Sequence, residues 1–424
     1  MQKGLKTNRG YLTLMASQAI SSIGDWLSVV AIITLVGLKW NATPMEVSFV
    51  ILSLALPMAL FGPLAGTFAD RFNRKALMIT SDFFRAGLIL ILTIADSLLV
   101  IYVSLLAIGT LSALFIPAKN GKLKELVHEE DMKSAMSITS MIDSGTKIIG
   151  PLLSGILVAA FSANMVFYID SMTFMISGLL IVMLPRQKHV SNEMAEKENR
   201  QITSFKEDFI TGLSYIKSNR FILMGLFLLG VSLMILQLSD SQIIVLLREL
   251  TSVSPDLFGY LVTSAGAGMF IAGWLLSKKT DYNPYFLMLI GVCGIGTSFG
   301  MMGILTYYDF GFSIFWGCGL GLTAGFSAGL TFVPFQASVQ VNTPVHLTGR
   351  VFGVVNSVTT TATIVGPLLG GWLSTIIGVI PTFITTASLL IILSLAGYLT
   401  RNKFARRKVD VTESKQGAPS EATS

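Results

Sequence analysis

Long runs of apolar residues, separated by short polar stretches, follow one another along the whole chain. A helix that crosses a bilayer needs about 20 mostly apolar residues. Twelve segments meet that requirement: 11–38, 47–69, 76–95, 98–117, 134–161, 165–184, 221–247, 257–276, 285–307, 311–335, 351–377 and 381–400. The pattern predicts an all-α membrane protein with twelve transmembrane helices.

The longest interruption of this pattern, residues 185–220, separates six predicted spans from six. Its middle is polar, and its end places apolar residues on one helical face, namely Phe205, Phe209, Ile210, Leu213 and Ile216. That spacing is typical of a helix that lies on a membrane surface. Four parts are therefore predicted: a six-helix bundle (1–184), a cytoplasmic linker with an amphipathic helix (185–220), a second six-helix bundle (221–400) and a disordered cytoplasmic tail (401–424).

The two halves resemble each other in sequence. GPLLSGIL begins at Gly150 and GPLLGGWL begins at Gly366, 216 residues later. Both octapeptides lie in the fifth predicted span of their half, and equivalent spans run in the same direction. This predicts two six-helix pseudo-repeats related by an axis along the membrane normal, which enclose a site near the midplane and alternate access by rocking.

The glycine and proline residues of the repeated octapeptide are expected to bend their helices rather than bind a ligand. The predicted kink residues are Gly150, Pro151, Gly155, Gly366 and Pro367.

Composition and charge support a lipid environment. Hydrophobic residues make up 52% of the chain and charged residues 13%, whereas a soluble domain carries about 25% charged residues. With the N-terminus in the cytoplasm, 26 of the 30 basic residues fall in inner loops, and only Lys39 and Arg248 fall in outer loops. The positive-inside rule then places both termini in the cytoplasm. The net charge of +6 therefore needs no nucleic-acid partner.

Asp25 is the leading candidate for chemistry, because it lies near the middle of the first predicted span. A charged residue there costs about 2.5–3.5 kcal/mol on insertion scales and marks a functional site by default. The carboxyl is suited to proton uptake and release, and it is equally suited to pairing with a cationic drug. The alternative is a buried polar anchor bonded to Ser21 or Ser28.

Asp143 and Lys147 are four residues apart in the fifth predicted span and share a helical face. They form either a structural pair or a part of the substrate or ion pathway. The residues 216 positions later, Thr359 and Thr363, are uncharged.

Three further acidic positions lie within predicted spans. Asp240 has Gln237 and Gln242 nearby, so this polar stretch is expected to line the cavity. Asp82, three residues before Arg85, predicts a local ion pair. Asp170, in the sixth span, is a weaker candidate.

The loop after the second predicted span reads GTFADRFNRK from Gly66 to Lys75. It resembles the signature loop of the major facilitator superfamily. Asn73 stands at the second glycine of that signature, and we expect it to adopt the left-handed conformation that asparagine tolerates. The resemblance implies that a set of residues in this loop latches the two halves together on the cytoplasmic side: Gly66, Asp70, Arg71, Arg74 and Lys75.

Further motifs resemble one branch of that superfamily. The glycine-proline element resembles the antiporter signature of drug exporters, with Ser154 at a position that is usually glycine. Gly24-Asp25, SDFFR (81–85) and IPAKN (116–120) resemble a twelve-span subfamily of macrolide exporters, siderophore exporters and lysophospholipid transporters. Drug antiporters commonly carry an arginine in the fourth span, but 98–117 has no basic residue, so proton coupling must use other groups.

The resemblance implies a secondary active transporter of the bacterial inner membrane. It would export amphiphilic or hydrophobic small molecules, macrolide-like or multidrug, by proton antiport. A lysophospholipid or siderophore transporter of the same fold is the alternative. Walker, HExxH and GxSxG motifs and Cys/His ligand clusters are absent from the sequence, so we expect no enzyme, cofactor or metal. The expected partners are the substrate, protons and the bilayer, with the protein a monomer.

Overall fold

The computed structural model describes residues 5–161, 163–185, 205–251, 257–278, 282–344 and 347–416. Within these ranges every regular element is a helix. The helices are η1 (Leu5–Thr7), α1 (Arg9–Thr34), the π-helix η2 (Leu35–Lys39), α2 (Pro44–Arg71), α3 (Arg74–Thr93), α4 (Leu98–Leu126), α5 (Glu129–Ala160), α6 (Ala163–Val182), α8 (Phe205–Ser218), α9 (Arg220–Asp240), α10 (Ile243–Leu247), α11 (Leu257–Ser277), α12 (Pro284–Tyr307), α13 (Ser313–Asn342), α14 (Thr348–Ile377) and α15 (Val379–Gln416).

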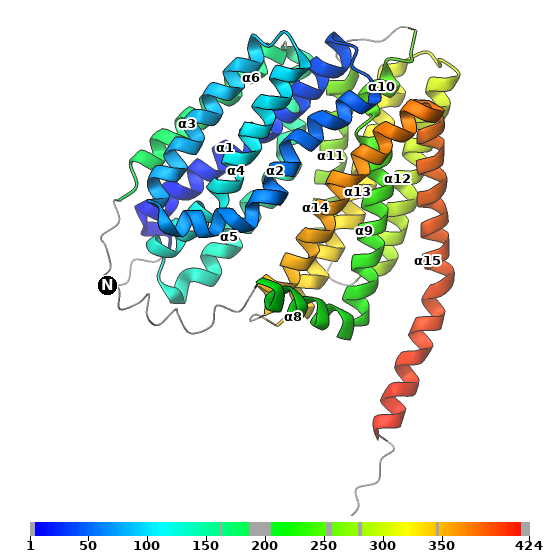
Figure 1. The fold of residues 1–424 in the computed structure, drawn as a ribbon. Helices are drawn as coiled ribbons and strands as arrows, with labels where there is room; N and C mark the ends of the chain where they lie inside the picture. The colour runs from blue at the N-terminus through cyan, green and yellow to red at the C-terminus, as the bar shows by residue number, and fades with distance from the viewer. Residues whose placement is uncertain are drawn as a thin grey trace, which may run out of the picture.

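The long helices lie side by side and form one elongated bundle (Figure 1). One end carries α8 and the other carries α10, and we call them the α8 end and the α10 end. Within the described residues, eleven helices are long and apolar enough to cross a membrane. The helix of the fifth predicted span, α5, falls outside this set, and its charged residues, Asp143 and Lys147 among them, lower its hydropathy. The structure thus confirms eleven of the twelve predicted spans by length and composition.

Helix packing follows the same scheme in the first six spans (α1–α6, the N half) and in the last six (α9–α15, the C half). In the N half, α1 packs against α5 and α6, and α4 packs against α2 and α3. In the C half, α9 packs against α14 and α15, and α13 packs against α11 and α12. The halves meet where α5 packs on α11 and α2 packs on α14. These contacts are symmetric, because each joins the second span of one half to the fifth span of the other.

The seventh predicted span is not continuous. The helix α9 ends at Asp240, and a turn at Ser241 and Gln242 precedes the short α10. The span predicted over 221–247 is confirmed by length and composition as Arg220–Leu247, but two helices form it. The reason is local, since serine and aspartate side chains compete with the backbone for hydrogen bonds and weaken a helix interior.

Asn73 corrects another expectation. Its φ of −63° and ψ of 109° are extended rather than left-handed. Its side-chain oxygen accepts a hydrogen bond from the backbone N–H of Ala76 at 3.2 Å. Asparagine is a strong N-cap residue, so Asn73 starts α3 in place of a glycine turn.

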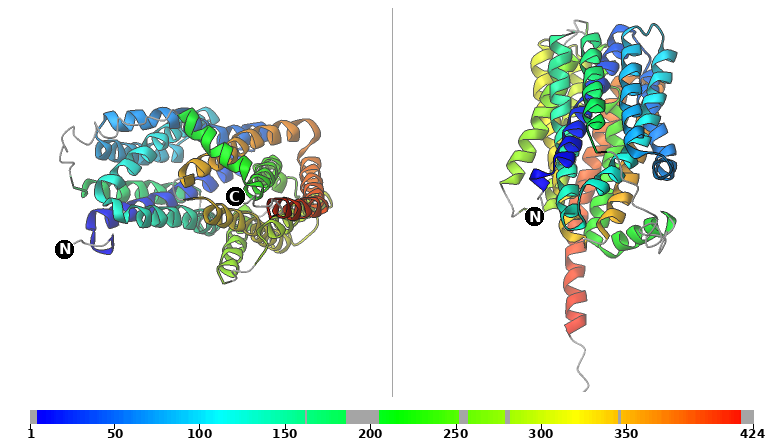
Figure 2. Two further views of the ribbon diagram at one scale, coloured as in Figure 1. Left: turned by 90° about the horizontal axis from the view of Figure 1, so that it is seen from below. Right: turned by 90° about the vertical axis from the view of Figure 1, so that its left-hand side faces the viewer.

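The chain beyond residue 400 also differs from the expected disordered tail. The helix α15 continues through Gln416 and projects beyond the bundle at the α8 end (Figure 2). Residues 398–416 contain no glycine or proline and are rich in helix formers such as lysine, arginine and glutamate. Residues 417–424 lie outside the described residues.

The linker helix α8 forms as the amphipathic pattern predicts, and it lies across the α8 end (Figures 1 and 2). Ile216 is fully buried and Leu213 packs against the core, whereas Ile210 is exposed. The helix rests on α14 and α9. The polar stretch 191–200 lies outside the described residues.

Candidate functional site

A charged cluster lies inside the N half, centred on Arg85 of α3. The Arg85 side chain is buried, and it forms an ion pair of 2.5 Å with Asp82. Its guanidinium lies 4.7 Å from the ring centroid of Phe115 and 4.4 Å from that of Phe174. Asp82, itself fully buried, also accepts a hydrogen bond of 2.6 Å from the Ser177 hydroxyl. The local ion pair that the sequence predicts is therefore present, and helices α3, α4 and α6 enclose it.

Asp25 joins this cluster from α1. One carboxylate oxygen lies 3.9 Å from Nη1 of Arg85, and the Asp25 side chain is 48% exposed while that of Arg85 is 3% exposed. Asp25 is thus the accessible member of a network whose other members are sealed. The predicted anchoring bonds from Ser21 and Ser28 are not made, because their hydroxyls contact Gln18 and Asp170 instead.

Asp170 of α6 lies beside this network and is fully buried. Its carboxylate accepts hydrogen bonds from the hydroxyls of Ser28 and Thr173. Within the described residues it makes no ion pair. From the sequence, Asp170 is a weaker candidate than Asp25, although both are acids within predicted spans.

Gly24 explains how α1 and α6 approach closely enough for these contacts. A Cβ atom at Gly24 would lie 2.2 Å from Oδ1 of Asp170 and 2.1 Å from Oγ1 of Thr173. Any larger side chain would overlap both groups. Gly24 therefore places a backbone without a side chain against Asp170, and Asp25 places a carboxylate beside Arg85.

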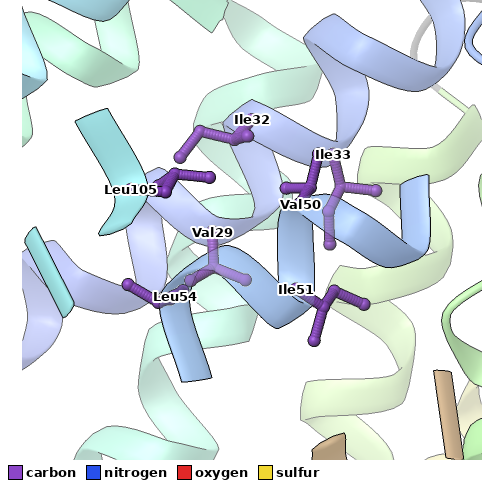
Figure 3. Close-up of a pocket in the computed structure, with 7 residues that line it drawn as sticks. All are labelled: Val29, Ile32, Ile33, Val50, Ile51, Leu54 and Leu105. Carbon is purple, nitrogen blue, oxygen red and sulfur yellow. The ribbon is translucent and has the colours of Figure 1, made fainter. Parts of the chain in front are cut away.

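An apolar pocket of about 50 Å³ lies where α1, α2 and α4 meet (Figure 3). Its seven lining residues are all aliphatic: Val29, Ile32, Ile33, Val50, Ile51, Leu54 and Leu105. Val29 stands four residues after Asp25 on α1, so the two side chains share a helical face. A carboxylate and an apolar recess thus follow one another along α1.

The other predicted site acids stand apart from this cluster. Asp143 accepts a hydrogen bond of 2.6 Å from Gln18, two turns before Asp25 on α1. The side chain of Lys147 lies outside the described residues, so the predicted Asp143–Lys147 pair stays a prediction. Asp240 is an exposed side chain in the last position of α9.

The predicted latch is described only in part, because the surroundings of Gly66 and the side chains of Asp70 and Arg71 lie outside what the structure describes. Arg74 forms an ion pair of 3.1 Å with Glu125 of α4. The Lys75 ammonium donates to the carbonyl oxygens of Val182 and Leu184 at the end of α6. These two basic residues brace the N half internally.

The repeated octapeptide makes equivalent contacts in both halves. A Cβ at Gly150 would lie 2.6 Å from Trp26 of α1, and a Cβ at Gly366 would lie 2.4 Å from Gln237 of α9. The first glycine of each motif therefore admits the first helix of its own half. The helices α5 and α14 continue through Pro151 and Pro367.

The glycine at the sixth position of each motif faces the opposite half. A Cβ at Gly155 would lie 2.1 Å from Oγ1 of Thr263 on α11, and a Cβ at Gly371 would lie 2.3 Å from Oγ of Ser48 on α2. These glycines allow the two halves to meet closely. The sequence predicts helix bending for this motif, and it does not predict this contact between the halves.

A polar clamp that the sequence does not predict joins the two halves at the α10 end. The Arg248 guanidinium donates to the carbonyl oxygens of Gly37 (3.1 Å) and Ala42 (2.7 Å). The Gln242 amide donates to Oγ of Ser48 at 2.9 Å. The Ser48 hydroxyl in turn donates to the carbonyl oxygen of Pro367 at 2.6 Å. We call Arg248, Gln242 and Ser48 the α10 clamp.

Comparisons with known proteins agree with this architecture. The family model described as Major Facilitator Superfamily matches residues 14–364. The uncharacterized MFS-type transporter YfiS of Bacillus subtilis (strain 168) is 38% identical over 430 residues, covering 99% of this chain and 100% of that protein. Macrolide efflux protein A of Streptococcus pyogenes is 26% identical, covering 91% of this chain and 94% of that protein.

The fold is also similar to the folds of solved structures. A structure of the nucleoside transporter NupG aligns with a TM-score of 0.68 at 12% identity, covering 92% of this chain and 100% of that chain. The symmetric packing of the halves, the match to the family model and the likeness to YfiS together lead to one conclusion. The chain belongs to the Major Facilitator Superfamily of membrane transporters.

Proposed function

We propose that this transporter exports amphiphilic or hydrophobic small molecules, macrolide-like compounds among them, by proton antiport with alternating access. The observation that carries the proposal is the pairing of Asp25 with the apolar pocket on one face of α1. The likeness to macrolide efflux protein A supports the substrate class.

The pairing suits an amphiphile that carries an amine. An ammonium group near Asp25 would find a carboxylate that is accessible and only loosely tied to Arg85, at 3.9 Å. A small apolar group of the same molecule would then lie against Val29 and Ile33, in the pocket of about 50 Å³. Proton and cationic substrate would compete for one carboxylate, and that competition is the simplest physical basis for exchanging one for the other.

The α10 clamp supports the alternating-access part of the proposal. It closes the α10 end through hydrogen bonds between the halves, and a rocking motion must break them. At the other end, the resemblance of the 66–75 loop assigns the matching latch to Asp70 and its basic neighbours. Asp70→Asn should then reduce transport while expression stays near normal, and full transport would remove that assignment.

The decisive test is transport in proteoliposomes with an imposed pH difference. A macrolide with an amino sugar should accumulate against its gradient in vesicles that contain the wild-type protein. Asp25→Asn should abolish this accumulation and leave downhill movement intact, whereas Asp309→Asn, at an exposed turn, should behave as wild type. Accumulation of a lysophospholipid or a siderophore, but of no macrolide, would move the substrate class to that alternative. Accumulation by Asp25→Asn at the wild-type level would exclude Asp25 from coupling.

Membrane orientation is part of the same proposal, with both termini and α8 in the cytoplasm of a bacterial cell. A single cysteine at the exposed Ser218 of α8 should be inert to an impermeant thiol reagent in intact cells and react after lysis. A cysteine at the exposed Glu249 should react in intact cells. The opposite pattern would invert the topology.

A further inference from the structure

Asp170 occupies a position where an ionised carboxylate is costly. Its side chain is fully buried, and its hydrogen-bond donors among the described residues are the hydroxyls of Ser28 and Thr173. A buried carboxylate without a cation costs several kcal/mol, even after relaxation of the protein. The neutral acid avoids this cost, because its O–H can donate to Ser28 while its carbonyl oxygen accepts from Thr173.

The charges around Asp170 also favour its neutral, protonated form. Among the described residues, the cation that acts on Asp170 is Arg85 of α3, and it is already paired with Asp82 at 2.5 Å. From α1, the charge that faces Asp170 is Asp25, which is also negative. From α5, Asp143 is bonded to Gln18 instead. With every group ionised, the cluster of three carboxylates and one guanidinium would carry two excess negative charges.

The C half shows that the contact between the first and sixth helices needs no acid. Thr386 stands 216 residues after Asp170, at the corresponding place in α15. It bridges to α9 through a hydrogen bond of 2.7 Å with Ser239. Two hydroxyls therefore suffice to join these helices, so the carboxyl of Asp170 contributes something that packing alone does not require.

We propose that Asp170 holds a transferable proton, and that Asp170 and Asp25 form one proton-binding unit within the N half. In this conformation the proton resides on the sealed Asp170, while the accessible Asp25 is ionised beside Arg85. When the helices shift, the O–H bond of Asp170 breaks and an O–H bond forms on Asp25, which releases the proton to solvent. One proton moves, and the total charge of the pair is unchanged until that release. The inference rests on the proposed proton antiport and assigns it a second carboxyl.

Infrared spectroscopy of the protein in lipid vesicles tests the proton directly and needs no substrate. At neutral pH the wild-type protein should show the C=O stretching band of a buried carboxylic acid. Asp170→Asn should remove that band, while Asp25→Asn and the surface variant Asp309→Asn should retain it. A spectrum unchanged by Asp170→Asn would overturn the proposal.

Two further variants keep the test sharp. Asp170→Thr installs the residue of the C half, so it keeps a hydroxyl bridge to α1 and should fold but lack the band. Gly24→Ala places a Cβ against Asp170 and should shift the band, whereas Gly87→Ala, which has open space around it, should not. A shift that Gly87→Ala reproduces would argue against the α1–α6 contact as its source.

Transport supplies the second readout. In proteoliposomes with an imposed pH difference, Asp170→Asn should lower substrate accumulation to the level of protein-free vesicles and preserve downhill exchange. Loss of the infrared band with full pH-driven accumulation would overturn the role of Asp170 in coupling. Failure of the wild-type protein to accumulate any substrate would instead count against the proposed function, since the infrared result stands without it.

Discussion

The two halves of this transporter share one helix-packing scheme but differ in what lies inside it. At the 216-residue offset, Asp82 and Arg85 of the N half correspond to Ser298 and Met301 of the C half. The buried Ser298 hydroxyl lies 3.0 Å from that of Thr323, where the N half has an ion pair. The same positions are thus charged in one half and neutral in the other.

The comparison of the two halves shows which polar contacts this helix packing needs. Neutral hydroxyl pairs are enough to join α12 to α13 and α9 to α15, so the repeat is stable without buried ions. We therefore expect the charges of the N half to serve something other than packing. Proton handling is the use that the proposals above give them.

Arg85→Met gives the strongest test of this comparison, because it installs the C-half residue and strands the buried Asp82. Removing one partner of a buried ion pair costs about 3–5 kcal/mol, so we expect poor expression and a strongly reduced Tm. The double variant Asp82→Ser/Arg85→Met removes both charges and should recover most of the loss, yet lack proton coupling. Thermal unfolding of the purified proteins measures both effects. A double variant no more stable than Arg85→Met would show that the N half depends on its ions for folding.

Arg248→Gln should have the next largest effect, because it removes a charged donor from two carbonyls across the α10 clamp. Hydrogen bonds to charged groups contribute about 1.5–3 kcal/mol. We expect the α10 end to open more often, which raises the labelling rate of a cysteine placed at the buried Val47 of α2 by tenfold or more. Lys39→Gln, an exposed neighbour on η2, is the matched control. Equal labelling in the two variants would show that the clamp does not hold this end closed.

Gly371→Ala tests the contact between halves with a single methyl group. Its Cβ would lie 2.3 Å from Oγ of Ser48, and overpacking of this kind costs about 1–3 kcal/mol. The closed arrangement of the α10 end should lose population, with a rise in the same cysteine labelling. Gly353→Ala, on the same helix with open space around it, should leave the labelling unchanged. An equal effect of both variants would trace the change to the helix rather than to the contact.

We expect the smallest effect from a change at Asp309, an acid of the C half that lies at the surface. Hydrogen bonds from the Thr251 hydroxyl and backbone N–H lower the pKa of Asp309 below its ordinary value. Because the folded-state pKa is depressed, this stabilisation is present above the ordinary value of about 3.9 and is lost as the pH falls through the lowered pKa. Asp309→Asn should therefore lower the Tm slightly at neutral pH and not at strongly acidic pH. A difference independent of pH would assign the effect to the turn itself.

Much of the fold could be predicted from the chain alone. The apolar runs located the spans, since each bilayer crossing needs its own length of apolar residues, and the repeated octapeptide located the symmetry between α5 and α14. The Asp82–Arg85 pair was also predictable, because residues three apart meet on any α-helix. The two breaks in the pattern were local, at Ser241–Gln242 and at Asn73. There, the side chains supplied the hydrogen bonds that decided the backbone path.

The site was predicted only in part. Asp25 was found because a lone acid in an apolar span is conspicuous, but its neighbours were not. Its distance from Arg85 depends on how α1 and α3 are rotated and offset along their axes, and no spacing within either helix records that. The same limit hid Asp170, whose importance comes from the hydroxyls and the glycine that face it.

The sequence by itself determined where the apolar helices lie, the relationship between the two halves and the pairs that lie within one helix turn. These depend on local hydrogen bonding and on the solvent that each segment requires. Only the tertiary structure decided which residues of different helices meet: Asp25 with Arg85, Ser28 with Asp170, and Arg248 with the end of η2. Such contacts follow from the way whole helices pack, because a small rotation or shift of one helix exchanges every side chain that it presents to the next.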